Sequence, residues 1–151
     1  MTVITICSSA NFFRQAAEVQ EKLGKLGFDV LMPETAILMK KSGDYNVNNY
    51  KTWLGDKNDY HKKTKLVRGH FDEIEKGDLI LVLNYEKHGI KNYIGGNVLM
   101  EMTIGFYLNK PIFILNNIPK ESPFLEEIMC LNSITLNGKL ELLPEEIKKV
   151  L

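Results

Sequence analysis

The stretch from Asp78 to Leu115 constrains the fold more than any other part of the sequence. It contains two continuous apolar runs, Leu79–Leu83 and Pro111–Leu115, of the length typical of parallel strands buried on both faces. Between them, Val98–Leu108 is apolar on nearly every side, as expected for a helix packed against a sheet. The stretch therefore predicts a strand, a glycine-containing loop, a helix and a second strand.

Glu101 is the one charged residue inside this apolar helix. An ionised carboxylate in such surroundings needs a partner, water or a ligand, because burying it dry and unpaired is costly. The preceding loop, Gly95-Gly96-Asn97, can present backbone N–H groups to a polar ligand, and Gly105 leaves room for a close approach one turn later. Two interpretations stay open: Glu101 faces a substrate, or its charge is stabilised by the helix N-terminus.

The periodicity of the whole chain predicts an α/β fold. Apolar runs predict strands at residues 3–7, 28–32, 79–83, 111–115 and 134–136. Helical spacing predicts helices at residues 12–26, 61–76, 98–108, 122–128 and 144–151, and residues 34–59 are expected to form an extended loop with one short helix near 36–41. This order predicts a flavodoxin-like or Rossmann-like three-layer sandwich with a five-stranded parallel sheet, in one domain of residues 1–151.

Composition narrows the range of partners and compartments. The formal net charge is zero with 25% charged residues, so no nucleic acid or anionic membrane is indicated as a partner. No apolar run approaches the ~20 residues that a membrane-spanning helix needs. Two cysteines, Cys7 and Cys130, are too few for a disulfide framework, so we expect a reduced, cytoplasmic protein. No metal site and no cofactor are expected.

Polar residues follow three of the predicted strands. Ser8-Ser9 follows the first strand, Asn84-Tyr85 the third and Asn116-Asn117 the fourth. Ligands of open α/β sheets bind beyond the carboxyl ends of the strands, so these residues and Glu101 are expected to line one crevice. Ser8 and Ser9 can instead serve only as helix caps. The aromatic residues of the expected loop can stack on a flat ligand or anchor the loop to the body: Tyr45, Tyr50, Trp53 and Tyr60.

His70 falls on the inward face of the helix at residues 61–76, beside Leu66, Phe71 and Ile74. It can be a catalytic residue or a hydrogen-bonded core residue. Other α/β chemistries fit less well, since a response regulator needs an acidic cluster and a flavodoxin a longer phosphate loop. Cys7 is not expected to be a nucleophile, because no base accompanies it in the sequence.

Four stretches together resemble one known family. They are Phe28–Pro33, Gly77-Asp78 at the start of an apolar strand, Tyr93–Glu101 and Asn109–Ile112. The chain resembles the nucleoside 2-deoxyribosyltransferase superfamily, and its short members most of all. The resemblance extends from the first strand to the Asn116-Asn117 loop, and its most specific part is the loop, helix and strand around Glu101.

The resemblance implies a function for Glu101. In that family a glutamate at this helix position is the nucleophile that attacks C1′ of a deoxyribose, and the related 2′-deoxynucleoside 5′-phosphate N-hydrolases transfer the sugar to water. The implied activity is cleavage or base exchange at the N-glycosidic bond of a deoxynucleoside or its 5′-monophosphate, in a homodimer or higher oligomer. The residues expected to contact this substrate are Ser8, Ser9, Asn84, Tyr85, Gly95, Gly96, Asn97 and Asn116, with the Trp53 loop as a further cover for the base.

Three positions depart from the family's pattern. Its usual strand tyrosine is Thr5, its usual catalytic aspartate falls on His70, and a polar residue six positions before the nucleophile is Gly95. His70 can replace the aspartate as a proton donor, because its unperturbed pKa of about 6.5 lies near neutrality. The departures leave open a non-catalytic nucleotide-binding or regulatory module. Hydrolysis of another N-glycoside, such as a nicotinamide nucleotide, is a third possibility.

Overall fold

The computed structural model describes residues 1–151 and contains a five-stranded, all-parallel sheet with strand order β2-β1-β3-β4-β5. This confirms the predicted α/β, flavodoxin-like three-layer architecture. The strands are β1 (Val3–Ser8), β2 (Asp29–Leu31), β3 (Leu79–Leu83), β4 (Ile112–Ile114) and β5 (Ile134–Thr135). Each falls within one residue or so of its predicted range, because continuous apolar runs mark strands that are covered on both faces.

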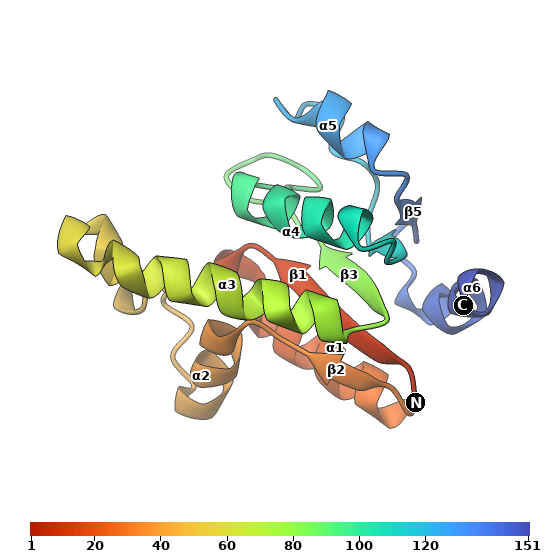
Figure 1. Ribbon diagram of the computed structural model, residues 1–151, viewed down its shortest axis with the longest axis horizontal. Helices are drawn as coiled ribbons and strands as arrows, with labels where there is room; N and C mark the ends of the chain where they lie inside the picture. The colour runs from red at the N-terminus through yellow and green to blue at the C-terminus, as the bar shows by residue number, and fades with distance from the viewer.

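Helices cover both faces of the sheet, as Figure 1 shows. The helices are α1 (Phe13–Lys25), α2 (Glu34–Ser42), α3 (Tyr60–Lys76), α4 (Gly96–Tyr107), α5 (Leu125–Cys130) and α6 (Leu143–Val150). The side chains of α1, α2 and α6 share one core cluster with Ile4, Ile6 and Leu81, whereas α3, α4 and α5 share another with Cys7, Ile80 and Val82. None of the helices combines the length and the apolar character needed to cross a membrane.

The segment from residue 34 to residue 59 is more ordered than the expected extended loop. The predicted short helix is α2, and three short 3-10 turns follow it at Val47–Asn49, Thr52–Leu54 and Lys57–Asp59. Side-chain oxygens of Asn46 and Asp56 accept backbone N–H groups two residues later, which stabilises two of these turns. Local hydrogen bonds of this kind produce structure without hydrophobic periodicity, so the sequence pattern did not reveal it.

Strand β1 directs the site side chains toward one face of the sheet. Successive side chains of a strand alternate between the two faces, and Ile4 and Ile6 pack in the cluster of α1. Thr5 and Cys7 therefore point to the face covered by α3 and α4. The Thr5 hydroxyl donates a 3.1 Å hydrogen bond to the carbonyl oxygen of Glu73, which ties β1 to the last turns of α3.

Helix α4 packs closely on the sheet at Gly105. A Cβ atom added there would collide with Cδ1 of Ile80 on β3. The sequence suggested that Gly105 leaves room for an approaching group, and that group is the sheet itself. This close packing sets the depth at which the same helix places Glu101.

Candidate active site

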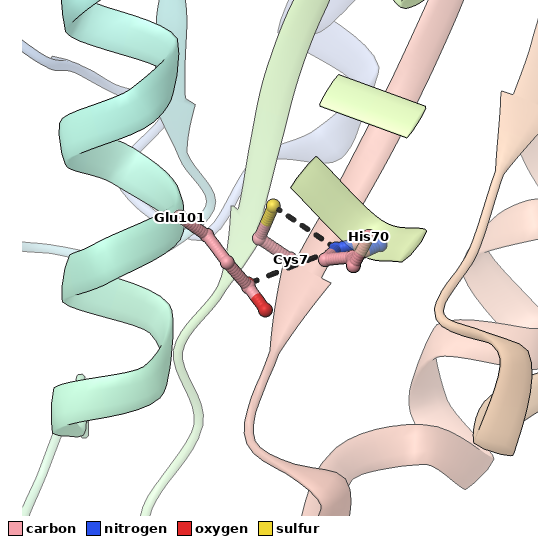
Figure 2. Close-up of side chains that lie close together, drawn as sticks. All are labelled: Cys7, His70 and Glu101. Carbon is pink, nitrogen blue, oxygen red and sulfur yellow. Dashed lines mark hydrogen bonds and ion pairs between the residues drawn. The ribbon is translucent and has the colours of Figure 1, made fainter. Parts of the chain in front are cut away.

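Cys7, His70 and Glu101 meet at the end of β1, although 63 residues separate the first from the second. Figure 2 shows their side chains converging from β1, α3 and α4. Sγ of Cys7, a ring nitrogen of His70 and a carboxylate oxygen of Glu101 all lie within 4.8 Å of one another, and all three residues are buried. The carboxyl end of a central strand is the usual location of an α/β active site.

The ring of His70 is held by contacts at both nitrogens. Its Nδ1 lies 2.7 Å from Oε2 of Glu73, one turn along α3, and its Nε2 lies 3.5 Å from Sγ of Cys7. An ionised carboxylate only accepts hydrogen bonds, so Nδ1 carries a proton in this arrangement. The sequence prediction that His70 lies on the inward face of its helix is confirmed.

Glu101 is 4% exposed and uses its two oxygens differently. Oε1 accepts a 2.8 Å hydrogen bond from the side-chain amide of Asn97. Oε2 is buried without a hydrogen-bond partner, and His70 Nε2 is 3.7 Å away, too far for a direct hydrogen bond. One carboxylate oxygen is thus oriented and the other is free.

Burial controls the electrostatics of the three side chains. It raises the pKa of Glu101, against the opposing effect of the positive charge of His70. Burial, together with the negative charge of Glu101, raises the pKa of the Cys7 thiol well above its ordinary value. Burial acts to lower the pKa of His70, but Glu73 and Glu101 outweigh it, so the net shift is upward. The two carboxylates thus favour the protonated form of the imidazole.

A cavity of about 190 Å³ opens beside Glu101 and His70. Its wall includes the predicted substrate-binding residues Ser8, Ser9, Gly95, Gly96 and Asn97. No side-chain oxygen caps the N-terminus of α4, whose first residue is Gly96, so its first backbone N–H groups can serve a ligand. The cap role considered for Ser9 is not seen, since its side chain makes no capping hydrogen bond.

Three lysines line the same cavity: Lys51, Lys63 and Lys87. Burial lowers the pKa of each of them, and the charge of Lys51 lowers those of Lys63 and Lys87 further. The ammonium group of Lys63 donates a 2.9 Å hydrogen bond to Oδ1 of Asn97. Positive charges that repel one another around a cavity favour an anionic ligand.

Aromatic side chains form another part of the wall. Trp53 and Tyr50 come from the segment after α2, and Tyr93 comes from the loop before α4. Trp53 is buried, with the ammonium group of Lys63 5.7 Å from its ring centroid. Tyr45 instead stacks against Arg14, and Tyr60 is exposed. The aromatic residues therefore divide between the cavity wall and other contacts.

Asn84, Tyr85 and Asn116, three residues expected to bind substrate, lie outside the cavity wall. The Asn84 amide donates to the carbonyl oxygen of Asn117, and its oxygen accepts the backbone N–H of Asn116. The Asn116 amide in turn donates to the carbonyl oxygen of Asn84. Tyr85 packs edge-on against Phe12, with ring centroids 5.4 Å apart. The geometry assigns these residues to structural contacts between loops.

The sequence interpretation missed the contact between Cys7 and a base. His70 lies beside the thiol, although no histidine is near Cys7 in the sequence. The sequence interpretation also expected no metal site. The structure brings together a thiol, an imidazole and a carboxylate, which are typical metal ligands: Cys7, His70 and Glu101. The available signal was periodicity, since Cys7 and His70 each fall on the buried face of an element next to the Glu101 helix.

Thr5 and Gly95 also have local structural roles. Thr5 is fully buried and bonded to α3, so it contributes to packing. A Cβ atom at Gly95 would lie 2.8 Å from the Tyr93 hydroxyl, so a larger residue would displace that ring from the cavity wall.

Comparison with models of known protein families gives no match, and comparison with curated proteins gives no significant relative.

Proposed function

We propose that this protein cleaves the N-glycosidic bond of a deoxynucleoside 5′-monophosphate or deoxynucleoside, with Glu101 as the nucleophile. One observation carries the proposal: Glu101 is buried beside a cavity, with Oε1 held by Asn97 and Oε2 free of hydrogen bonds. A nucleophilic carboxylate needs this combination, because one oxygen must be oriented while the other attacks carbon.

The reaction follows from the chemistry of a sugar carbon with a nitrogen leaving group. Oε2 of Glu101 forms a bond to C1′ while the bond from C1′ to the base breaks, and the electron pair leaves with the base. Water or a second base then attacks C1′ and releases the carboxylate, and the proton that the attacking group loses goes to the departed base. The transition state has oxocarbenium character, as in glycosidases, so a nearby negative charge stabilises it.

His70 acts on the carboxylate in this proposal. Its pKa is raised, and its Nε2 lies 3.7 Å from Oε2 of Glu101. A protonated imidazole at that distance favours the ionised form of Glu101, which burial alone would disfavour. Because Glu73 holds Nδ1, the ring keeps this orientation before a substrate binds. His70 is therefore a positioning residue.

The lysines of the cavity favour a substrate with a phosphate group. Lys51, Lys63 and Lys87 line the wall, and Lys87 also donates a 3.1 Å hydrogen bond to the hydroxyl of Ser9. The uncapped N-terminus of α4 adds backbone N–H groups at the same wall. A phosphate bound there would relieve the repulsion between the ammonium groups. We therefore prefer a 5′-monophosphate to an unphosphorylated nucleoside.

The test is a product assay on metal-free protein in EDTA, because Glu101 lies beside two other side chains of types that bind metals, Cys7 and His70. Each common deoxynucleoside and 5′-monophosphate is incubated with the protein, with and without a second free base, and the products are separated by chromatography. Release or exchange of a base by the wild type, absent in Glu101→Gln, supports the proposal and separates hydrolase from transferase. Binding of a nucleotide without turnover would overturn it in favour of a nucleotide-binding module.

We also propose a homodimer. Several large apolar side chains on α4 and α5 are exposed, including Tyr107 at 80% and Met129 at 60%. Met100 and Tyr107 are two turns apart on α4, so they lie along one outward face. Ile128 of α5 is fully buried and belongs to the core, so it takes no part in this face. We also propose a cytoplasmic location, as expected from the small number of cysteines.

A further inference from the structure

Two of the distances between the donor atoms of Cys7, His70 and Glu101 are close to those of a metal site, and all three atoms lie within 4.8 Å of one another. Sγ of Cys7 lies 3.5 Å from Nε2 of His70, and Nε2 lies 3.7 Å from Oε2 of Glu101. Tetrahedral Zn²⁺, with bonds of about 2.3 Å to sulfur and about 2.0–2.2 Å to nitrogen and oxygen, sets S···N near ~3.6 Å and N···O near ~3.4 Å. The observed separations differ from these by only a few tenths of an ångström.

Glu73 and Asn97 orient two of the donors, in the way that hydrogen-bond partners orient metal ligands. Glu73 lies 2.7 Å from Nδ1 of His70, which fixes the proton there and leaves the lone pair of the neutral ring on Nε2. Asn97 holds Oε1 of Glu101 and leaves Oε2 available. Nε2 of His70 and a carboxylate oxygen of Glu101 lie within 4.8 Å of Sγ of Cys7, and Figure 2 shows the three side chains converging.

The unpartnered oxygen is an independent sign of a missing ligand. Oε2 of Glu101 is buried without any hydrogen bond, although buried carboxylate oxygens are nearly always satisfied. His70 alone does not satisfy it, because the distance is 3.7 Å. A cation placed among Sγ, Nε2 and Oε2 would satisfy all three atoms together.

We propose that Cys7, His70 and Glu101 bind one Zn²⁺ ion, or another divalent ion with affinity for thiolate. A thiolate, a carboxylate and a neutral imidazole balance its charge, and the Cys7 thiol proton and the Nε2 proton of His70 go to the solvent. The thiolate disfavours Mg²⁺ and Ca²⁺, which prefer oxygen ligands. His70 and Glu101 line the cavity, so a fourth ligand, such as water, can reach the ion from there.

A bound ion would switch off the N-glycosidic reaction. Oε2 of Glu101 is both the free oxygen of the proposed nucleophile and the oxygen next to the metal position. Coordination withdraws its electron pair from attack on C1′, so the metal-loaded protein is inactive. This loss of activity, unlike metal binding itself, rests on the function proposed above.

The binding experiment uses the full chain, stripped with EDTA and kept reduced. Calorimetric titration with Zn²⁺ should show one site per chain, and Co²⁺ should give the thiolate charge-transfer absorption of a cysteine-ligated ion. Cys7→Ser should remove that absorption and weaken binding more than about 100-fold, whereas Glu73→Gln should weaken it about 10- to 100-fold by releasing His70. Cys130→Ser changes an exposed cysteine and His61→Gln an exposed histidine. Neither variant should alter the absorption or the affinity for the metal.

The outcomes separate the metal site from the proposed activity. The metal site would be overturned if the wild type shows no saturable binding. It would also be overturned if Cys7→Ser and Glu73→Gln both bind the metal as the wild type does. Binding that depends on these residues would establish it, even if the metal-free protein cleaves no N-glycoside and the proposed function fails. If the metal-free protein is active, one equivalent of Zn²⁺ should abolish the activity and EDTA should restore it. Activity that persists with Zn²⁺ bound would overturn the proposed inhibition by the metal.

Discussion

The side-chain amide of Asn97 donates a 2.8 Å hydrogen bond to Oε1 of Glu101, one turn further along α4. The ammonium group of Lys63 donates in turn to Oδ1 of Asn97, which fixes the direction of the amide. A chain of contacts thus runs from α3 through the loop end of α4 to the proposed nucleophile. It orients one oxygen of the carboxylate and leaves the other for reaction.

Asn97→Ala should lower kcat on the order of 100-fold, because the carboxylate loses its fixed orientation. Burial raises the pKa of Glu101 above the ordinary value of 4.5, while the Asn97 hydrogen bond lowers it. The nucleophile must be ionised, so activity falls as pH drops through this pKa, and the acid limb of kcat/KM should move to higher pH in Asn97→Ala. The pH profile of metal-free protein checks this, with exposed Asn48→Ala as the control. An unmoved acid limb would contradict the assigned role.

Lys51→Met and Lys87→Met should each raise KM for a deoxynucleoside 5′-monophosphate by about 10-fold or more, since each removes a charged partner of the phosphate. KM for the matching unphosphorylated nucleoside should change little. Steady-state kinetics with both substrates measures the difference, and exposed Lys57→Met provides the matched control. Equal effects on both substrates would place the phosphate elsewhere.

Gly105→Ala should destabilise the protein by about 1–3 kcal/mol, because the new methyl group collides with Ile80 and pushes α4 from the sheet. Gly69→Ala is the matched control on α3, where nothing lies within 4 Å of the added Cβ atom. That substitution should stabilise the protein by up to about 1 kcal/mol through helix propensity. Urea unfolding measures both changes. Equal free energies of unfolding for the two variants would refute the close packing of α4.

The two cysteines should differ strongly in reactivity toward a thiol reagent at pH 8. Cys130 is exposed, whereas Cys7 is fully buried and burial raises the pKa of its thiol. The native, metal-free protein should therefore show one rapidly modified thiol, which Cys130→Ser removes. Both thiols should react in denaturant. Rapid modification of Cys7 in the native protein would mean that the end of β1 opens readily.

Tyr107→Glu should convert the proposed homodimer into a monomer, because it places a charge on the exposed apolar face of α4. Sedimentation velocity over a range of concentrations measures the mass. Leu54→Glu changes an exposed apolar residue on a different segment and should leave the dimer intact. A wild-type monomer at every concentration would rule out the dimer.

Periodicity accounts for the parts of the site that sequence could predict. The buried strand β3 follows from a continuous apolar run and the apolar face of α3 from a spacing of 3.6 residues, which are properties of the local chain. Glu101 stood out for the same reason, since it is the only charge in an apolar helix. The inward position of His70 also followed from helical spacing.

Other features of the site depended on contacts that local patterns do not contain. Asn84 and Asn116 looked like ligand-binding residues because they follow strands, but their amides join two loops to each other. The sequence pattern of α3 reveals no partner for Lys63, whereas the neighbouring helix places Asn97 against it. Side-chain polarity predicts that a partner exists, whereas the tertiary structure selects which one.

The sequence by itself determined the strands, the helices and the buried faces, because hydrophobic burial acts on each segment through its own periodicity. Only the tertiary structure decided that Cys7, His70 and Glu101 share one site. Their meeting depends on the pairing of β1 with β3 and on the packing of α3 beside α4 across that pair. Such relations join residues far apart in the chain, so they become fixed only when the whole sheet assembles.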